Sequence, residues 1–356
     1  MSLRRRDLFR FGGLGGGIGL IGAAGWSVAK VWGAKDRSAA ALPLLDVDCT
    51  TDVSYTATAA GSASAPPGSA AAGWPAPGYA AKFAPPAYYA GERDSLHIPP
   101  PRAPFSNELR EFDLSVVETT LEVAGGQNVN VWAYGGTVPG PIIRATVGEQ
   151  LKITLANHAG AAHSVHFHGA HDVLQDGLER VRGGGNQVYQ FEAGPAGLHP
   201  YHCHVPPYGR HIAKGMYGSM IVDPREPRPA AHEFVLCLCG FDTDGDGRND
   251  IYAWNGVAGY FERFPLKVPA GELVRIYLMN MLEHDPIASF HLHAQTFDLY
   301  RSGTSLTPHE HTDIVGLGPA ERAIIEFRLP RRGRYMFHPH QSHMAERGAM
   351  GWIVAI

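Results

Sequence analysis

The sequence has little of what marks a nucleic-acid-binding, membrane-spanning or disulfide-stapled protein. Charged residues make up only 18% of the 356, and the formal net charge of -4 gives no reason to expect nucleic acid or an anionic membrane as a partner. Four cysteines are too few for a disulfide framework in a chain of this length. Histidine, by contrast, occurs 19 times, and it is the commonest side-chain metal ligand.

No apolar run is long enough to be a clear membrane span. Residues 4–9 read Arg-Arg-Arg-Asp-Leu-Phe and precede a glycine-rich apolar stretch over 11–26. This order is typical of a secretory signal, and the paired arginines resemble a twin-arginine signal. A permanent anchor is the alternative, but the stretch is shorter than the roughly 20 apolar residues that span a bilayer. We predict that residues 1–41 direct export to the periplasm or the cell exterior, with no permanent membrane span.

Composition separates an arm from the rest of the chain. Residues 42–107 are rich in alanine, proline, glycine and serine, and such a segment cannot bury enough surface to order itself. We predict a linker or a loosely draped arm there.

Short β-rich runs broken by glycine and proline follow, with few helical periods, which predicts an all-β fold of sandwiches or barrels. The predicted strands are 109–123, 127–133, 150–156, 187–192, 220–222, 233–238, 273–279, 322–329 and 352–356.

The same sequence markers occur twice in the same order, which predicts two copies of one domain, at 108–226 and 227–356. In each copy a Gly-Glu pair precedes an apolar run that ends at asparagine, and two His-x-His pairs follow. The first set is Gly148-Glu149, Asn157, His166-Phe167-His168 and His202-Cys203-His204; the second is Gly271-Glu272, Asn280, His291-Leu292-His293 and His338-Pro339-His340.

The four His-x-His pairs indicate a metal centre. Side chains alternate faces along a strand, so both histidines of a pair project from one side. A single pair is more often two ordinary core or surface histidines, but four pairs at matched places are a strong signal. Eight imidazoles are too many for one tetrahedral zinc. The eight are His166, His168, His202, His204, His291, His293, His338 and His340.

The first copy alone adds a thiolate. Cys203 lies between two of these histidines, so its sulfur points away from the face that carries them. Two histidines, a cysteine and a weakly bound methionine form the ligand set of a blue-copper site, and His163, Cys203, His211 and Met216 supply it. Taken alone, Met216 would be an ordinary core methionine. Its place five residues after His211 makes it a ligand candidate.

The second copy lacks the blue-copper ligands. Ala288 stands where the first copy has His163, and Pro339 stands where it has Cys203. Without the thiolate and that histidine no blue site can form, although His343 could be a remnant of one. The sequence therefore predicts one mononuclear copper site per chain.

These motifs resemble those of the multicopper oxidases. The resemblance covers about residues 108–356 and is carried by the run Val138-Pro-Gly-Pro-Ile-Ile-Arg144, by His-x-His-Gly at 166–169 and by His-Cys-His at 202–204. The missing second-domain cysteine places the chain nearest the two-domain laccase-like subgroup. The resemblance implies two tandem cupredoxin-like Greek-key β-barrels. It also implies a homotrimer that shares each three-copper cluster between the first domain of one subunit and the second domain of the next.

The resemblance also implies a role for each ligand. His166 and His291 would hold the type 2 copper, and the other six paired histidines would hold the type 3 pair. Asp176 would be a proton donor near the type 2 copper, although a solvated Asp-Gly turn is the alternative. A small phenol or a reduced metal ion would donate electrons, and O2 would be reduced to water. Nothing in the sequence identifies the donor.

Two other functions stay open. Copper nitrite reductase shares the two-domain trimer and a first-domain blue copper, but that family has an aspartate where His166 stands and lacks an imidazole where His204 stands. Copper counting separates the two, since the oxidase would hold four coppers per chain and the reductase two. A periplasmic copper-storage or electron-carrier protein would need no matched histidine pairs in the second domain.

Two minor motifs have simple interpretations. The run Asp242-Thr-Asp244-Gly-Asp246-Gly resembles the start of a calcium loop, but Ala253 stands where the bidentate glutamate is expected, so a polar turn is favoured. Cys237 and Cys239 lie two apart in an apolar run and are predicted to be buried strand thiols.

Overall fold

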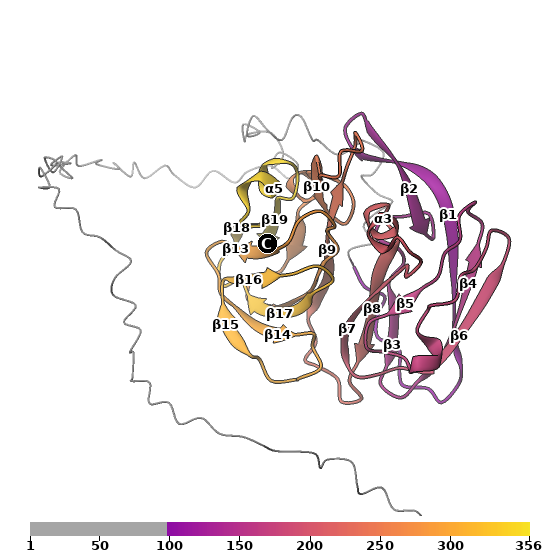
Figure 1. The fold of residues 1–356 in the computed structure, drawn as a ribbon. Coiled ribbons are helices and arrows are strands. Elements are labelled where there is room, and N and C mark those ends of the chain that lie inside the picture. Colours follow the sequence, from indigo (N-terminus) through magenta and orange to yellow (C-terminus); the bar gives the residue numbers. More distant parts are fainter. Residues whose placement is uncertain (1–97) are drawn as a thin grey trace, which may run out of the picture. The chain divides into compact units, whose positions relative to one another are not determined.

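The computed structural model describes residues 98–356 (Figure 1). The predicted signal at 1–41, the predicted arm as far as residue 97, and Cys49 lie outside the described residues. Over the part that is described, no helix combines the length and the apolar character needed to cross a membrane.

The described end of the arm, 98–107, forms neither helix nor strand and is fastened to later parts of the chain. Arg102 Nη2 donates a hydrogen bond to the backbone oxygen of Pro224 at 2.9 Å. Arg144 Nη1 donates to the backbone oxygen of Pro100 at 2.8 Å. These bonds hold the start of the described chain against the first domain.

The first repeat folds into two four-stranded sheets, with strand orders β2-β1-β4-β6 and β3-β8-β7-β5 (Figure 1). Alternating burial shows how the sequence directs this: in β4 every second residue is buried, so that Leu151, Ile153 and Leu155 face the core. The elements are β1 (Arg110–Ala124), β2 (Gln127–Tyr134), β3 (Ile143–Thr146), β4 (Gln150–Asn157), β5 (His166–Phe167), η2 (Val173–Gln175), β6 (Asn186–Glu192), β7 (Gly197–His202), α3 (Tyr208–Ala213) and β8 (Tyr217–Asp223).

The second repeat has a six-stranded sheet, β10-β9-β12-β17-β14-β15, and a five-stranded sheet, β11-β19-β18-β13-β16. The elements are β9 (His232–Phe241), β10 (Ile251–Trp254), α4 (Tyr260–Arg263), β11 (Leu266–Val268), β12 (Leu273–Asn280), β13 (Ala288–Leu292), β14 (Phe297–Arg301), β15 (Glu310–Thr312), β16 (Ile314–Leu317), β17 (Arg322–Arg328), β18 (Gly333–His338), α5 (Ser342–Glu346) and β19 (Gly351–Ala355).

The two repeats share their strand pairing. The pair β1–β4 is parallel, as is β9–β12, and β3–β8 is parallel, as is β11–β19. The histidine strands match as well, because His166 pairs with His202 across β5 and β7 while His291 pairs with His338 across β13 and β18. The repeat detected in the sequence is therefore a repeat of topology.

The all-β prediction is confirmed, and each predicted strand is present within a few residues of its expected bounds. The sequence patterns missed the strands that carry the histidines. Every residue of β7 is buried, and β5 has only two residues, so neither shows the alternation of buried and exposed positions by which a strand is recognised.

Besides one core in each repeat, a third apolar cluster contains residues of both. Cys237 and Cys239 belong to this third cluster, are fully buried and have their sulfur atoms 4.0 Å apart, as expected for strand thiols that act as small apolar side chains. Tyr217 at the start of β8 packs in the same cluster. Shared burial of this kind stabilises the contact between the repeats.

Buried ion pairs also connect the two repeats. Arg144 of β3 lies 2.8 Å from Asp223 of β8 and 2.7 Å from Glu233 of β9. Glu233 also lies 2.9 Å from Arg275 of β12, which is 2.6 Å from Glu326 of β17. Although burial opposes its ionisation, the hydrogen bonds from Arg144 and Arg275 hold the pKa of Glu233 below its ordinary value. Removal of one partner leaves buried charges uncompensated.

Replacing Glu233 by glutamine is therefore expected to lower the free energy of unfolding by about 3 kcal/mol. Because the folded-state pKa of Glu233 is depressed, its contribution is present above the ordinary glutamate pKa and is lost as the pH falls through the folded-state value. Denaturant unfolding followed by circular dichroism measures the change. Glu111→Gln is the control, because its ion pair with Lys152 is on the surface and contributes at most about 1 kcal/mol. Equal unfolding midpoints for the two variants would contradict the expectation.

Candidate metal centre

Three of the four side chains predicted to hold a mononuclear copper converge in the core of the first repeat. The sulfur of Cys203 lies 3.2 Å from Nδ1 of His211 and 3.8 Å from Nδ1 of His163. The two Nδ1 atoms are 3.2 Å apart. Met216 is joined to them through its backbone oxygen, which accepts a hydrogen bond from Cys203 N at 3.0 Å. Two imidazoles and a thiol that face one another are a donor set suited to copper.

Secondary structure places each of these side chains. Cys203 directly follows β7 and Met216 directly precedes β8, its antiparallel neighbour, so both lie at one end of the same pair of strands. His211 is on α3, the short helix between those strands. His163 precedes β5 and is held by two backbone hydrogen bonds to Val181.

Burial sets the protonation of this group. Burial lowers the pKa of His163 to about 4, with the neighbouring His211 as a second cause, and burial likewise lowers the pKa of His211. Burial raises the pKa of the Cys203 thiol. The imidazoles are therefore neutral and able to ligate at neutral pH, and a bound cation would favour the thiolate. Nε2 of His163 is buried without a hydrogen-bond partner, and Nδ1 is the nitrogen that faces the thiol.

Four histidines of the first repeat form a second cluster, on the opposite side of the Cys203 backbone. Nε2 of His168 lies 2.8 Å from Nε2 of His202. The ring of His166 lies 5.1 to 5.4 Å from the rings of the other three, His168, His202 and His204. Burial lowers the pKa of His168 to about 3 and that of His202 to about 4, with neighbouring histidines as a further cause. Four imidazoles this close together can share metal ions here.

Four histidines of the second repeat form a matching cluster. Nε2 of His293 lies 2.9 Å from Nε2 of His338. The ring of His291 lies 4.8 to 5.6 Å from the rings of His293, His338 and His340. Burial lowers the pKa of His293 and of His338. We call the cluster of the first repeat half-site 1 and that of the second repeat half-site 2.

Matching backbone and serine contacts hold the two half-sites in one geometry. Nδ1 of His202 faces the backbone oxygen of the next residue at 3.0 Å, and Nδ1 of His338 does the same at 2.7 Å. The backbone nitrogen of His204 donates to Ser164 Oγ, and that of His340 donates to Ser289 Oγ. Sequence reasoning missed both serines, although each lies two residues before the first histidine of its half-site. These contacts leave Nε2 of His202 and His338 directed at the cluster.

Acidic residues stand beside the first histidine of each half-site. Nδ1 of His166 lies 3.0 Å from Asp176 Oδ1 and 3.2 Å from the backbone oxygen of the same residue. Nδ1 of His291 lies 2.9 Å from the backbone oxygen of Asp313, whose carboxylate is 3.7 Å away. Asp176 was predicted from the sequence to lie near this histidine, whereas Asp313 was not found. Nothing in the sequence marks Asp313 as a site residue except its position, twenty-two residues after His291.

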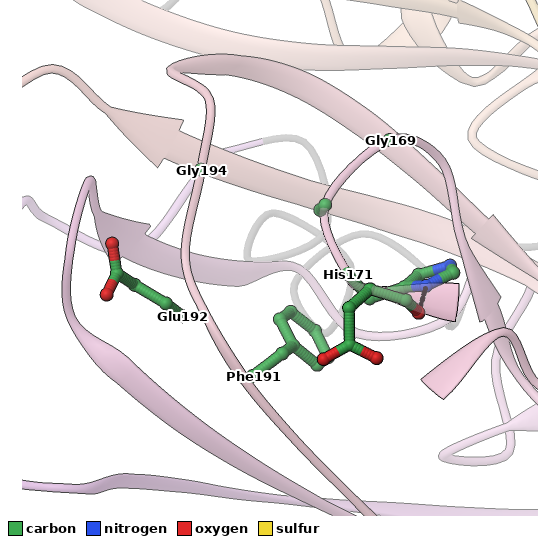
Figure 2. A pocket seen from close by; sticks show the side chains of 7 residues that line it. Gly169, His171, Phe191, Glu192 and Gly194 are labelled. Carbon is green, nitrogen blue, oxygen red and sulfur yellow. Dashed lines mark hydrogen bonds between the residues drawn. The ribbon is translucent and has the colours of Figure 1, made fainter. Parts of the chain in front are cut away.

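His171 is a further residue that sequence reasoning missed. Its Nε2 lies 3.3 Å from Nδ1 of His166 and 3.7 Å from Asp176 Oδ1, and its Nδ1 lies 2.7 Å from the backbone oxygen of Asp172. Its ring lies beside Phe191 (Figure 2). Both residues line a pocket of about 270 Å³. The pocket is lined by Gly169, Ala170, His171, Asp172, Phe191, Glu192 and Gly194. His171 thus stands between this pocket and half-site 1.

The two half-sites do not meet within one chain. Among the described residues, each of the eight histidines has ring contacts with members of its own half-site and none with the other. His293 is exposed, and His291 and His338 are only partly buried. Half-site 2 therefore presents imidazoles at the surface of the chain, whereas the histidines of half-site 1 are partly or fully buried.

Two other sequence features lie apart from these clusters. His343 is on α5 and lies 3.8 Å from Asp285 and against the ring of Tyr252, with no contact to half-site 2. The carboxylates of Asp242, Asp244 and Asp246 lie within 4.8 Å of one another, and Asp242 accepts hydrogen bonds from backbone nitrogens of its own loop. The loop has the geometry of a polar turn.

The comparison with known proteins decides the family. Two models described as multicopper oxidase match the chain, one over residues 115–227 and the other over residues 241–355. The chain belongs to the multicopper oxidase family. A solved multicopper oxidase is 43% identical to it with a TM-score of 0.69, over 70% of this chain and 89% of the other. The predicted family and the predicted fold of cupredoxin-like domains are confirmed.

This multicopper oxidase is also similar to copper nitrite reductases. The solved enzyme from Nitrosomonas europaea is 29% identical with a TM-score of 0.64, over 70% of this chain and 94% of the other. The copper-containing nitrite reductase of Neisseria meningitidis serogroup A is 30% identical in an alignment of 266 residues, gaps included, that covers 67% of this chain and 68% of the relative. Family membership implies an oxidoreductase that binds copper.

Proposed function

We propose that this multicopper oxidase is laccase-like and couples the one-electron oxidation of a phenol or a metal ion to the four-electron reduction of O2 to water. The observation that carries the proposal is the pair of half-sites, each with four imidazoles in the same arrangement. A single type 2 copper needs fewer ligands than these eight. A cluster of three coppers would use them all.

The ligands divide into three groups. His163, Cys203, His211 and Met216 would hold a type 1 copper, His166 and His291 a type 2 copper, and six histidines a type 3 pair: His168, His202, His204, His293, His338 and His340. Copper bound there would supply reversible one-electron chemistry at the first site and a place for O2 at the others. The imidazoles and the Cys203 thiol are the donor types that copper prefers.

Cys203 connects the two kinds of site. Its sulfur faces His163 and His211, whereas the residues before and after it, His202 and His204, face half-site 1. The sulfur, the backbone of Cys203 and either flanking imidazole form one short covalent path. The tripeptide therefore offers electrons a route between the mononuclear site and the cluster.

We further propose a homotrimer in which half-site 1 of one subunit faces half-site 2 of the next. The support is that the two half-sites of one chain lie apart and that half-site 2 is partly exposed. A head-to-tail contact of this kind must close into a ring to avoid an open filament.

We also keep the proposal that residues 1–41 direct export by the twin-arginine route.

Copper nitrite reductase is the second candidate, and the two similar reductases favour it. Metal analysis of copper-loaded protein separates the functions. The oxidase requires about four coppers per chain and consumption of O2 with a phenol, whereas the reductase requires about two coppers and consumption of nitrite. Two coppers per chain with no O2 uptake would rule out the oxidase.

Asp176→Asn is expected to lower the rate of O2 reduction about a hundredfold, because we propose that Asp176, whose Oδ1 lies 3.0 Å from Nδ1 of His166, passes protons to half-site 1. Reduction of the type 1 copper by the donor should be unchanged. Rapid mixing without O2, which measures that step, should therefore give the wild-type rate, whereas steady-state O2 uptake should be slower. Asp172→Asn is the control, since its carboxylate caps the backbone nitrogen of Leu174. Full O2 uptake by Asp176→Asn would support the solvated turn instead.

A further inference from the structure

An aromatic ring stands against both histidines of the proposed type 1 site. The ring centroid of Trp132 lies 5.1 Å from that of His163, at an interplanar angle of 75°, and 4.8 Å from that of His211. Trp132 is partly buried and packs against the apolar core of the first repeat. His163 is fully buried and His211 is 4% exposed. A large apolar ring in this position helps to keep water from the two imidazoles.

The backbone of Trp132 is tied to the segment that carries the last two proposed ligands. Its nitrogen donates a hydrogen bond at 2.9 Å to the backbone oxygen of Lys214, which lies between His211 and Met216. The next residue, Gly215, has a φ of 103°, and a methyl group placed on it would lie only 3.2 Å from the backbone oxygen of Trp132. These two backbone contacts hold Trp132 against the ligand segment.

A positive charge lies over the same ring. The guanidinium carbon of Arg210 is 5.4 Å from the ring centroid of Trp132, within the range of a cation–π contact. Arg210 is exposed and directly precedes His211. After burial, the charge of Arg210 is the second cause of the lowered pKa of His211. The guanidinium therefore acts electrostatically on one of the proposed ligands.

The second repeat has a matching contact but lacks the thiol. Tyr252 stands two residues before the end of β10, just as Trp132 stands two residues before the end of β2. The ring of Tyr252 lies 5.5 Å from that of His343, which the sequence suggested as the remnant of a ligand. Tyr252 donates a hydrogen bond to Asp285 at 3.0 Å. An apolar ring with a cation thus stands in the repeat that has the thiol, and a polar ring with an acid stands in the repeat that lacks it.

The ring and the charge both affect a reduction potential in the same direction. The oxidised form of a site with one copper ion carries one more positive charge than the reduced form. Water stabilises the more highly charged form, so an apolar shell that excludes water favours the reduced form. A nearby cation repels the more highly charged form and therefore also favours the reduced form. Each effect raises the potential.

We propose that Trp132 and Arg210 together set the reduction potential of the type 1 site and that both raise it. Trp132 excludes water from His163 and His211, and Arg210 contributes its charge. Both are positioning residues, since neither is among the proposed ligands. A higher potential allows the site to accept electrons from donors that release them less readily. This inference rests on the type 1 site of the proposed function.

The test measures the equilibrium between copper-loaded full-length protein and the ferrocyanide–ferricyanide couple, without O2, from the blue absorption. Trp132→Ala is expected to shift this equilibrium about tenfold towards the oxidised protein, which is a potential lower by about 59 mV. Trp132→Phe keeps an apolar ring and should stay within about threefold of the wild type. The position of the blue absorption maximum should be unchanged, because the ligands are the same.

The charge of Arg210 is tested separately by its dependence on salt. Arg210→Gln is expected to shift the same equilibrium about threefold towards the oxidised protein at low salt. This shift should disappear at about 1 M salt, where exposed charges are screened. The shift caused by Trp132→Ala should persist there, because exclusion of water does not depend on charge screening.

A matched pair of controls lies in the second repeat. Trp352 is also partly buried, and the guanidinium carbon of the exposed Arg334 lies 4.4 Å from its ring centroid. Because this repeat lacks the type 1 ligands, Trp352→Ala and Arg334→Gln should leave the equilibrium within about twofold of the wild type. If the Trp132 and Arg210 variants do the same, the inference is wrong. Loss of the blue absorption in both Trp132 variants would show that the ring only holds the ligands in place, which would also overturn it.

The outcomes separate this inference from the proposed function. Neither the copper count nor O2 uptake enters the measurement. A blue protein that holds two coppers and reduces nitrite would therefore overturn the oxidase and leave the role of Trp132 and Arg210 standing. A wild-type protein without blue absorption would overturn the type 1 site and this inference together.

Discussion

Cys203→Ser is expected to abolish the blue colour and to lower the rate of donor oxidation by about a thousandfold or more. Serine is nearly the same size as cysteine, so the buried space beside His163 and His211 is kept, but its hydroxyl cannot replace the thiolate as a soft ligand. The covalent path to half-site 1 loses its metal end at the same time. Visible absorption and steady-state O2 uptake with a phenol measure the two effects.

The same variant should keep most of its other copper. His202 and His204 belong to half-site 1 and are not altered by the substitution. Metal analysis should therefore show a loss of only about one copper per chain. Cys237→Ala is the matched control, because Cys237 is equally buried but lies in the third apolar cluster, away from the proposed type 1 ligands. It should stay blue and active. A blue Cys203→Ser protein would contradict the ligand assignment.

The double substitution His293→Ala and His338→Ala is expected to abolish O2 reduction, with a loss of about a thousandfold or more. These two imidazoles face each other at 2.9 Å in half-site 2, so the change removes half of its ligands. The proposed type 1 site belongs to the other repeat and should be unaffected. The blue absorption and its bleaching by a donor without O2 should therefore equal those of the wild type.

The control for the double substitution is His309→Ala with His311→Ala. Both histidines are exposed on the second repeat at β15, and His311 pairs with Asp298 on the surface. This control should keep full O2 uptake. Retention of O2 reduction by the His293 and His338 variant would show that half-site 2 takes no part in the reaction, which would remove the basis of the shared cluster.

Much of the fold and the proposed ligand set could be predicted because the chain repeats itself. A strand places alternate side chains on one face, so His-x-His is a local pattern that indicates its geometry without any tertiary information. Comparison of the repeats then separated the single Cys203 from its counterpart Pro339. The strands that lead into these pairs, each of which contains only the first histidine, were not predicted. One reason is that β7 is buried along its whole length and shows no alternation.

The residues around the ligands were harder to find. His171 and Asp313 carry no motif, and their proximity to His166 and His291 depends on loops whose course the sequence does not reveal. Trp132 is a clearer case, since its contact with His163 and His211 joins three separate parts of the chain. No sequence pattern reports contact between such distant segments.

The sequence by itself determined the all-β class, the two repeats, the eight paired imidazoles and the one cysteine that lies between two of them, because each follows from residue type, spacing and repetition along the chain. Only the tertiary structure decided which side chains meet: Cys203 with His163 and His211, Asp176 with His166, and Arg210 with Trp132. The physical reason is the distance along the chain over which each interaction acts. Backbone geometry dictates the direction of a side chain within a strand, whereas the meeting of distant strands depends on how the whole core packs.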